Sequence, residues 1–199
     1  MYALTVDRRG SRADPGALVM TEQRDRFDAD LPRPVLGWQI SAGDELQALY
    51  DTAQDVLTTV FALVDEQEWH VGLGIGTVDT PLPDHVNEAT GPAFVAAREA
   101  VTASKETGYP AVRGTAWASH AQAVLTLASA VRQRRTRAAR EATDLAERGL
   151  TQQQIAATLG IAQSSVSRRL SSALWSQEQA THPTVLTCLQ LADGAAEAP

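Results

Sequence analysis

The stretch from residue 150 to residue 175 constrains the fold of this chain more than any other. Thr151 and Gln154 have the spacing of a capping box, in which each side chain satisfies a free backbone group at the start of a helix. Ile155 and the leucine four residues later place apolar side chains on one face of that helix. Gly160 follows, and glycine tolerates the left-handed backbone at a helix end. The pattern predicts a short helix that ends at a glycine turn.

A second helix is expected from about Gln163, with Val166, Leu170 and Leu174 on its inner side. Ala162, at its cap position, has no side-chain acceptor, so this helix start lacks the usual capping group. Two helices that cross through a short turn form a helix-turn-helix. The residues expected to contact DNA lie on the outer face of the second helix and at the start of the first: Gln163, Ser164, Ser165, Ser167, Arg168, Arg169, Thr151 and Gln152.

This stretch resembles the helix-turn-helix of sigma-factor-like and response-regulator-like DNA-binding domains. The resemblance implies that the second helix enters the major groove of double-stranded DNA. Side chains assigned to base edges are Gln163, Ser164, Ser165 and Arg168, and those assigned to phosphates are Ser167 and Arg169. Because one recognition helix gives little affinity, we expect a homodimer formed through the N-terminal domain. The alternative is an ordinary helical hairpin with a solvated polar face.

The distribution of charge agrees with a DNA-binding C-terminal part. The chain has a net charge of −7, but residues 1–130 hold 9 Lys+Arg and 18 Asp+Glu, whereas residues 131–180 hold 8 and 4. Overall acidity therefore limits non-specific binding without excluding specific binding. The sequence has no apolar run of membrane-spanning length and no signal-peptide core at its N-terminus, so we expect a cytoplasmic protein without a membrane partner. Its one cysteine, Cys188, is expected to be a small buried residue.

The N-terminal part predicts an α+β domain. Strands and helices alternate in the following order: strand 2–6, helix 15–30, hairpin bending at 43–45, helix 51–66, strand 69–78, a helix opening at Gly91 and Pro92, and strand 111–118. A helical pattern then runs from residue 121 to residue 148, where charge and composition change. We expect a sheet-and-helix domain over 1–120, a connecting helix over 121–140, the helix-turn-helix domain over 141–180 and a tail over 181–199, with a disordered end.

Residues 2–118 resemble the catalytic fold of class III nucleotide cyclases and diguanylate cyclases, a ferredoxin-like sheet. Four motifs carry the resemblance: D-R-R-G-S from Asp7, G-D-E at 43–45, V-G-L-G-I-G at 71–76 and G-P-A-F-V-A-A-R at 91–98. The resemblance implies that Asp7 and Asp44 bind a nucleotide with Mg²⁺, since two converging carboxylates suit that ion. Phe94 stands where such cyclases carry an asparagine, and only Arg98 remains of that pair. A degenerate domain for dimerisation or ligand sensing is favoured over an active metal-dependent cyclase.

A cyclase-like domain followed by a helix-turn-helix is similar to the SatD-like family of bacterial proteins. That family implies a bacterial cytoplasmic protein with a DNA-binding end, so we expect a transcriptional regulator. The resemblance supplies neither a ligand nor a regulon. The glycines of G-L-G-I-G lie within a strand, so close backbone packing explains them better than a dinucleotide loop. Just before the helix-turn-helix lies a basic run that comprises Arg132, Arg134, Arg135, Arg137 and Arg140. Two interpretations of this run stay open: contact with DNA phosphates, or pairing with the acidic N-terminal domain.

Overall fold

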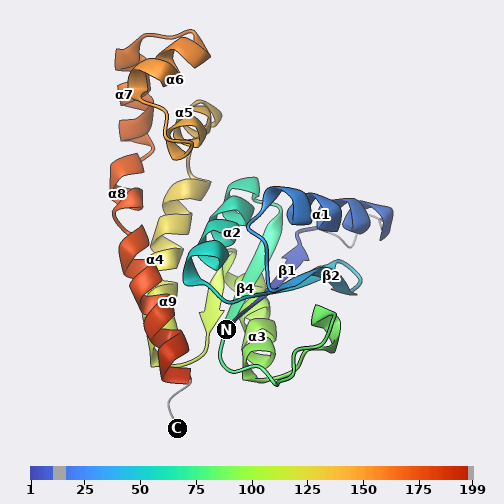
Figure 1. Cartoon of the computed structure of the whole chain (residues 1–199). Helices are drawn as coiled ribbons and strands as arrows, with labels where there is room; N and C mark the ends of the chain where they lie inside the picture. The colour runs from blue at the N-terminus through green and yellow to red at the C-terminus, as the bar shows by residue number, and fades with distance from the viewer. Residues whose placement is uncertain (11–16, 197–199) are drawn as a thin grey trace.

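A computed structural model describes residues 1–10 and 17–196 and shows an α+β fold with a helical extension (Figure 1). The strands form one sheet in the order β2-β3-β1-β4-β5. Neighbouring strands are antiparallel, except that β4 and β5 are parallel. The strands are β1 (Tyr2–Arg8), β2 (Leu36–Ala42), β3 (Glu45–Tyr50), β4 (Trp69–Ile75) and β5 (Ala111–Arg113). The expected α+β class and the hairpin bend between β2 and β3 are confirmed.

Helices connect and extend the sheet. The bounds are α1 (Ala17–Asp30), α2 (Ala53–Glu66), α3 (Pro92–Thr107), α4 (Ala116–Gln133), α5 (Arg137–Glu147), α6 (Gln152–Leu159), α7 (Gln163–Ser172), α8 (Trp175–Gln179) and α9 (His182–Ala196), with a short 3-10 turn η2 (Val86–Glu88). Among the described residues, none of these helices combines the length and apolar character that crossing a bilayer would require. The expected helix start at Pro15, the side chain of Leu18 and residues 197–199 lie outside what the structure describes.

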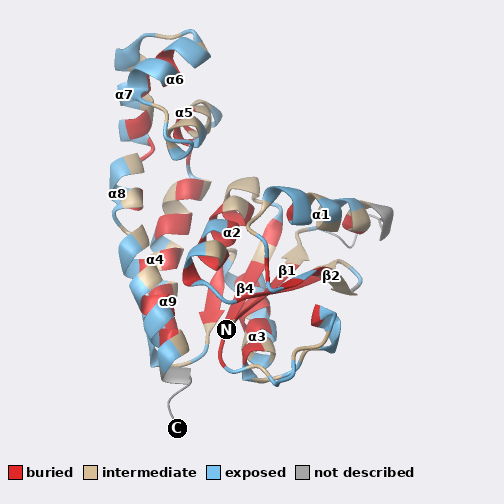
Figure 2. Cartoon of the chain, in the orientation of Figure 1, coloured by how far each residue is buried: buried red, intermediate tan, exposed pale blue. Residues whose placement is uncertain are grey.

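The alternating side chains of β1 separate two cores. Tyr2, Leu4 and Val6 pack with α2, α4 and α9 in the larger core, whereas Ala3 packs in a smaller core beneath α3. The larger core also contains Phe27, whose ring meets Trp38 and Trp69 edge to face at about 5 Å. Figure 2 shows that the strands and the inner faces of these helices are buried.

Two glycines of β4 allow α3 to approach the sheet closely. A Cβ atom added at Gly72 would lie 2.1 Å from the backbone nitrogen of Val101, and one added at Gly74 would lie 2.0 Å from the carbonyl oxygen of Ala93. Any larger residue would push α3 off the sheet. Close backbone packing, the expected reason for the G-L-G-I-G run, is confirmed.

The C-terminal segment corrects the prediction of a tail. Residues 182–196 form α9, which lies along α4 (Figure 1) and buries Val185, Cys188, Leu189 and Ala192 in the larger core. The side chain of Cys188 is buried, as expected. The chain therefore leaves the sheet domain along α4 and returns to it along α9, so its last described helix belongs to the sheet domain.

Two further predictions were wrong in their boundaries. The expected single helix over 121–148 is two helices, because Thr136 caps the start of α5 by accepting a hydrogen bond from the backbone nitrogen of Ala139 at 3.2 Å. The last strand is shorter than predicted, because α4 begins at Ala116, within the expected range 111–118. The connection between the sheet domain and the helix-turn-helix is consequently a bend with its own capping group.

Candidate nucleic-acid interface and the network behind it

Helices α5, α6 and α7 form a small bundle at the end of the α4–α9 pair (Figure 1). Its core contains Ala142, Ile155, Ala156, Val166 and Leu170. Among the residues that the structure describes, the bundle shares no core cluster with the sheet domain, so α6 and α7 are held mainly by α5 and by each other.

The predicted turn has the expected geometry. The hydroxyl oxygen of Thr151 accepts from the backbone nitrogen of Gln154 at 3.3 Å, and the side-chain oxygen of Gln154 accepts from the backbone nitrogen of Thr151 at 2.9 Å. Both halves of the capping box are therefore made. Gly160 ends α6 with φ of 64°, the left-handed conformation that favours glycine. Ala162 precedes α7 without a side-chain cap, as predicted.

Helix α7 presents a polar face to solvent. Gln163, Ser164, Ser167 and Arg168 are exposed, and Ser165 is half-buried. At the start of α6, the predicted contact residues Thr151 and Gln152 are exposed too. The structure therefore brings most of the predicted DNA-contacting residues to the surface of one helical unit.

Arg169 differs from its neighbour Arg168. Its guanidinium donates to the carbonyl oxygen of Ala138 at 3.2 Å and lies 3.5 Å from a carboxylate oxygen of Glu141, both on α5. The side chain of Arg169 is 28% exposed. Arg169 therefore joins α7 to α5, and Arg168 is the arginine of this pair that projects from the surface.

The prediction that Leu174 lies on the inner side of the second helix is wrong. Helix α7 ends at Ser172, and Leu174 has a φ of 50° and is 46% exposed between α7 and α8. The left-handed residue turns the chain, and the next residue, Trp175, packs against the bundle core instead. Residue 174 thus belongs to the connection that returns the chain to α9.

The basic run divides into buried and exposed arginines. Arg132 and Arg135 are 2% and 6% exposed, while Arg134 and Arg137 are exposed. Arg140 donates to two backbone carbonyl oxygens. Arg132 pairs with Asp65, so pairing with the acidic N-terminal domain is the correct interpretation for this residue, whereas Arg135 pairs with Glu178 on α8. Because both side chains are buried, neither arginine can reach a phosphate.

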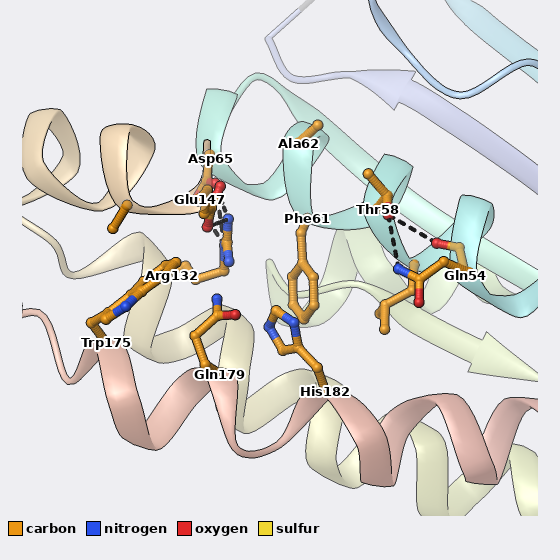
Figure 3. A pocket seen from close by; sticks show the side chains of 12 residues that line it. Gln54, Thr58, Phe61, Ala62, Asp65, Arg132, Glu147, Trp175, Gln179 and His182 are labelled. Atoms are coloured by element: carbon orange, nitrogen blue, oxygen red, sulfur yellow. Dashed lines mark hydrogen bonds and ion pairs between the residues drawn. The ribbon is translucent and has the colours of Figure 1, made fainter. Parts of the chain in front are cut away.

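These two arginines form an ionic network behind the helix-turn-helix. Figure 3 shows its part around Arg132, with Asp65 and Glu147. The guanidinium of Arg132 lies 2.5 Å from a carboxylate oxygen of Asp65 on α2, 2.8 Å from one of Glu147 on α5, and 3.0 Å from one of Glu178 on α8. Arg135 binds the second oxygen of Glu178 at 3.1 Å. The network therefore ties the sheet domain to the helix-turn-helix through α4 and α8.

Glu178 is the centre of that network. Its side chain is completely buried, and His182 Nε2 lies 2.5 Å from one of its oxygens. Burial alone would raise the pKa of Glu178, but the hydrogen bond with His182 and the positive charge of Arg132 lower this pKa to about 2. The ring of His182 also stacks on Phe61 with centroids 4.6 Å apart, and Arg132 covers the Phe61 ring at 4.6 Å.

The three residues predicted to bind a nucleotide with a metal ion, Asp7, Asp44 and Arg98, lie in different surroundings. Asp7 pairs with Lys105 on α3 at 2.5 Å. Asp44 lies in the hairpin bend, where its carbonyl oxygen accepts from the backbone nitrogen of Arg8 at 3.4 Å. Arg98 is exposed on α3, and burial raises the pKa of Glu45, the neighbour of Asp7 across the sheet.

Binding of a nucleotide with Mg²⁺ by Asp7, Asp44 and Arg98 stays a prediction, and a metal ion at Asp7 would have to compete with Lys105. The ammonium group of Lys105 already neutralises the carboxylate of Asp7. In the described parts of the chain, no three His, Cys, Asp or Glu side chains gather in a group that could hold a metal ion. A magnesium site would need further oxygen ligands beside this pair of aspartates.

Comparison of the chain with protein-family models, with curated proteins and with solved structures found no match. The assignment of a function therefore rests on the residues and their geometry. From the sequence we did not identify four residues of this network: Asp65, Glu147, Glu178 and His182. One signal was present, because Arg132 and Arg135 continue the heptad-like spacing of the buried residues of α4: Ala121, Leu125 and Ala128.

Proposed function

We propose that this protein is a sequence-specific binder of double-stranded DNA, a cytoplasmic bacterial transcriptional regulator whose recognition helix is α7. The observation that carries the proposal is the two-sided character of α7. Val166 and Leu170 hold it in the bundle core, while Gln163, Ser167 and Arg168 lie free on its outer side. Such a helix, following a capped helix and a glycine turn, suits insertion into a major groove.

The chemistry of the exposed side chains supports base recognition as well as phosphate contact. Arg168 can donate two hydrogen bonds to a guanine, whereas the amide of Gln163 can donate one hydrogen bond to N7 of an adenine and accept one from its amino group. The serine hydroxyls can donate to phosphates or to base edges. Because Arg169 is engaged by α5, we assign Arg168 the larger part in DNA binding.

A homodimer is part of this proposal, because specific sites for helix-turn-helix proteins are commonly read by two recognition helices. We place dimer formation in the sheet domain. Light scattering at micromolar protein concentration, with and without DNA, should show a dimer, and a monomer under both conditions would contradict this part. Kinship with the SatD-like family belongs to the same proposal and rests on the sequence motifs.

We further propose that the sheet domain has no cyclase activity. The Asp7–Lys105 ion pair supports this, because it occupies the carboxylate that would bind the metal ion. Incubation with ATP or GTP and Mn²⁺ should give no cyclic product. Product formation that is lost in Asp44→Ala would contradict the proposal and make the chain an enzyme.

The main test is recovery of bound fragments from a sheared bacterial genome at physiological salt. Wild type and the control Arg33→Ala, which removes an exposed arginine from the sheet domain, should enrich the same motif. Arg168→Ala should lose the motif or bind it roughly 5- to 150-fold more weakly, as expected for one base or phosphate contact. Equal enrichment by all three proteins would contradict the proposal that α7 contacts DNA through Arg168.

A further inference from the structure

A cleft lies between the sheet domain and the helix-turn-helix (Figure 3). Its volume is about 330 Å³, at the small end of the range of small-molecule sites, roughly 300–1,000 Å³. Phe61 and Asp65 line it from α2, Glu147 from α5, and Trp175 and His182 from α8 and α9. The walls therefore come from elements on both sides of the junction.

The acidic groups that line this cleft are the carboxylates of Asp65 and Glu147, which lie beside the imidazole of His182, whose side chain is 25% exposed. The side chain of Arg132 is 3% exposed, because Asp65, Glu147 and Glu178 surround its guanidinium. By contrast, the side chains of Asp65 and Glu147 are 26% and 35% exposed. Burial raises the pKa of Glu147, which indicates a carboxylate whose charge the network does not fully compensate.

The rest of the wall is suited to an apolar body. Trp175 contributes an indole ring, with Arg135 5.8 Å from its centre, and Leu57, Ala62 and Ala146 add aliphatic surface. The amides of Gln54 and Gln179 provide neutral polar contacts. The cleft disfavours an anion, because Arg132, the cation that would attract it, is already surrounded by three carboxylates.

We propose that this cleft binds a small organic cation with an aromatic or aliphatic body, such as an amine or an amidine. The cationic group contacts Asp65 and Glu147, and the apolar body lies beside Trp175. Because Asp65 belongs to α2 and Glu147 to α5, the ligand bridges the sheet domain and the helix-turn-helix. An effect of this ligand on DNA affinity would rest on the proposed function, but its binding does not.

The test is a titration of the full-length protein, without DNA, followed by amide and indole NMR shifts. Benzylamine and benzamidine are the cationic probes, and benzyl alcohol and benzoate are neutral and anionic controls of similar size. We expect saturable shifts at Asp65, Glu147 and Trp175 with the two cations only. Equal shifts with benzyl alcohol, or no saturable shifts with either cation, would overturn the proposal.

Variants locate the site. Glu147→Gln should weaken benzamidine binding roughly tenfold or more, because it removes one charged partner. Glu141→Gln, on the same helix and outside the cleft, should bind as wild type does. Ala62→Met adds bulk to the wall that α2 contributes, without changing charge, and should also weaken binding. This second variant keeps the test decisive if Glu147→Gln is poorly folded. Undiminished binding by Glu147→Gln or by Ala62→Met would contradict the assignment.

Discussion

Replacing Glu178 with glutamine should destabilise the protein by about 3 kcal/mol at neutral pH. The change removes a negative charge that is completely buried and leaves the guanidinium of Arg135, whose side chain is 1% exposed, without its carboxylate. Breaking a buried ion pair on one side costs about 3–5 kcal/mol. The pKa of Glu178 gives a similar magnitude, because a fall from 4.5 to about 2 corresponds to roughly 3 kcal/mol in favour of the folded, ionised state.

The cost of the substitution should depend on pH in a defined direction. The pKa of Glu178 is lowered on folding, so its contribution is fully present above the unfolded pKa of 4.5 and is lost as the pH falls through about 2. Urea unfolding followed by circular dichroism should therefore show a difference of about 3 kcal/mol at pH 7 and roughly 1 kcal/mol at pH 2.5. The control Glu99→Gln, at an exposed site on α3, should change stability by less than about 0.5 kcal/mol at either pH.

A double variant tests the reason for the loss. Glu178→Gln with Arg135→Met removes both charges of the buried Arg135–Glu178 pair, so the double variant should be less destabilised than the sum of the two single variants. A cost below about 1 kcal/mol for Glu178→Gln at pH 7, or a cost that does not change with pH, would refute the reasoning.

Two further predictions concern backbone positions. Gly74→Ala should cost at least about 3 kcal/mol in urea unfolding or yield insoluble protein, because its Cβ would lie 2.0 Å from the carbonyl oxygen of Ala93. The control Gly194→Ala, in open space on α9, should be neutral or stabilising by up to about 1 kcal/mol. Similar behaviour of the two variants would contradict the packing argument. Ala162→Ser should stabilise the helix-turn-helix by about 0.5–1 kcal/mol, since it supplies the missing cap of α7, and faster amide hydrogen exchange in α7 of this variant would show the opposite.

The helix-turn-helix could be predicted from sequence because its signals are local. The capping box of Thr151 and Gln154, the turn at Gly160 and the buried pair Val166 and Leu170 each depend on residues a few positions apart. Leu174 was misplaced because its spacing continues the apolar stripe of α7, whereas the chain turns at that residue through a left-handed conformation. Spacing alone does not reveal where a helix ends.

The ionic network could not be predicted because it joins elements far apart in the sequence. Asp65, Arg132 and Glu178 lie on α2, α4 and α8, and they come together only in the folded chain. A stretch rich in arginine suggests exposure to solvent or contact with nucleic acid. Only the position of Arg132 on the buried stripe of α4 indicated a buried side chain. The apolar spacing of Val185, Leu189 and Ala192 is typical of an amphipathic helix, and the prediction of a tail overlooked it.

The order of strands and helices in the sheet domain was largely predictable from alternation and periodicity. The environment of Asp7 was not, because Lys105, the residue that neutralises it, lies on α3, more than ninety positions away. The motif resemblance placed two aspartates near one hairpin but carried no information on that lysine. Site chemistry in this domain therefore depends on a tertiary contact that the motifs do not contain.

The central claim is that α7 is the surface that meets DNA. Amide shift mapping of the full-length protein with a short duplex that carries the enriched motif, or with a random duplex at low salt if none is enriched, tests this claim most directly. We expect the largest shifts at Gln163, Ser167 and Arg168, with smaller ones at Thr151 and Gln152, and little change around Asp7. Shifts confined to the sheet domain, or no shifts at low salt, would contradict it.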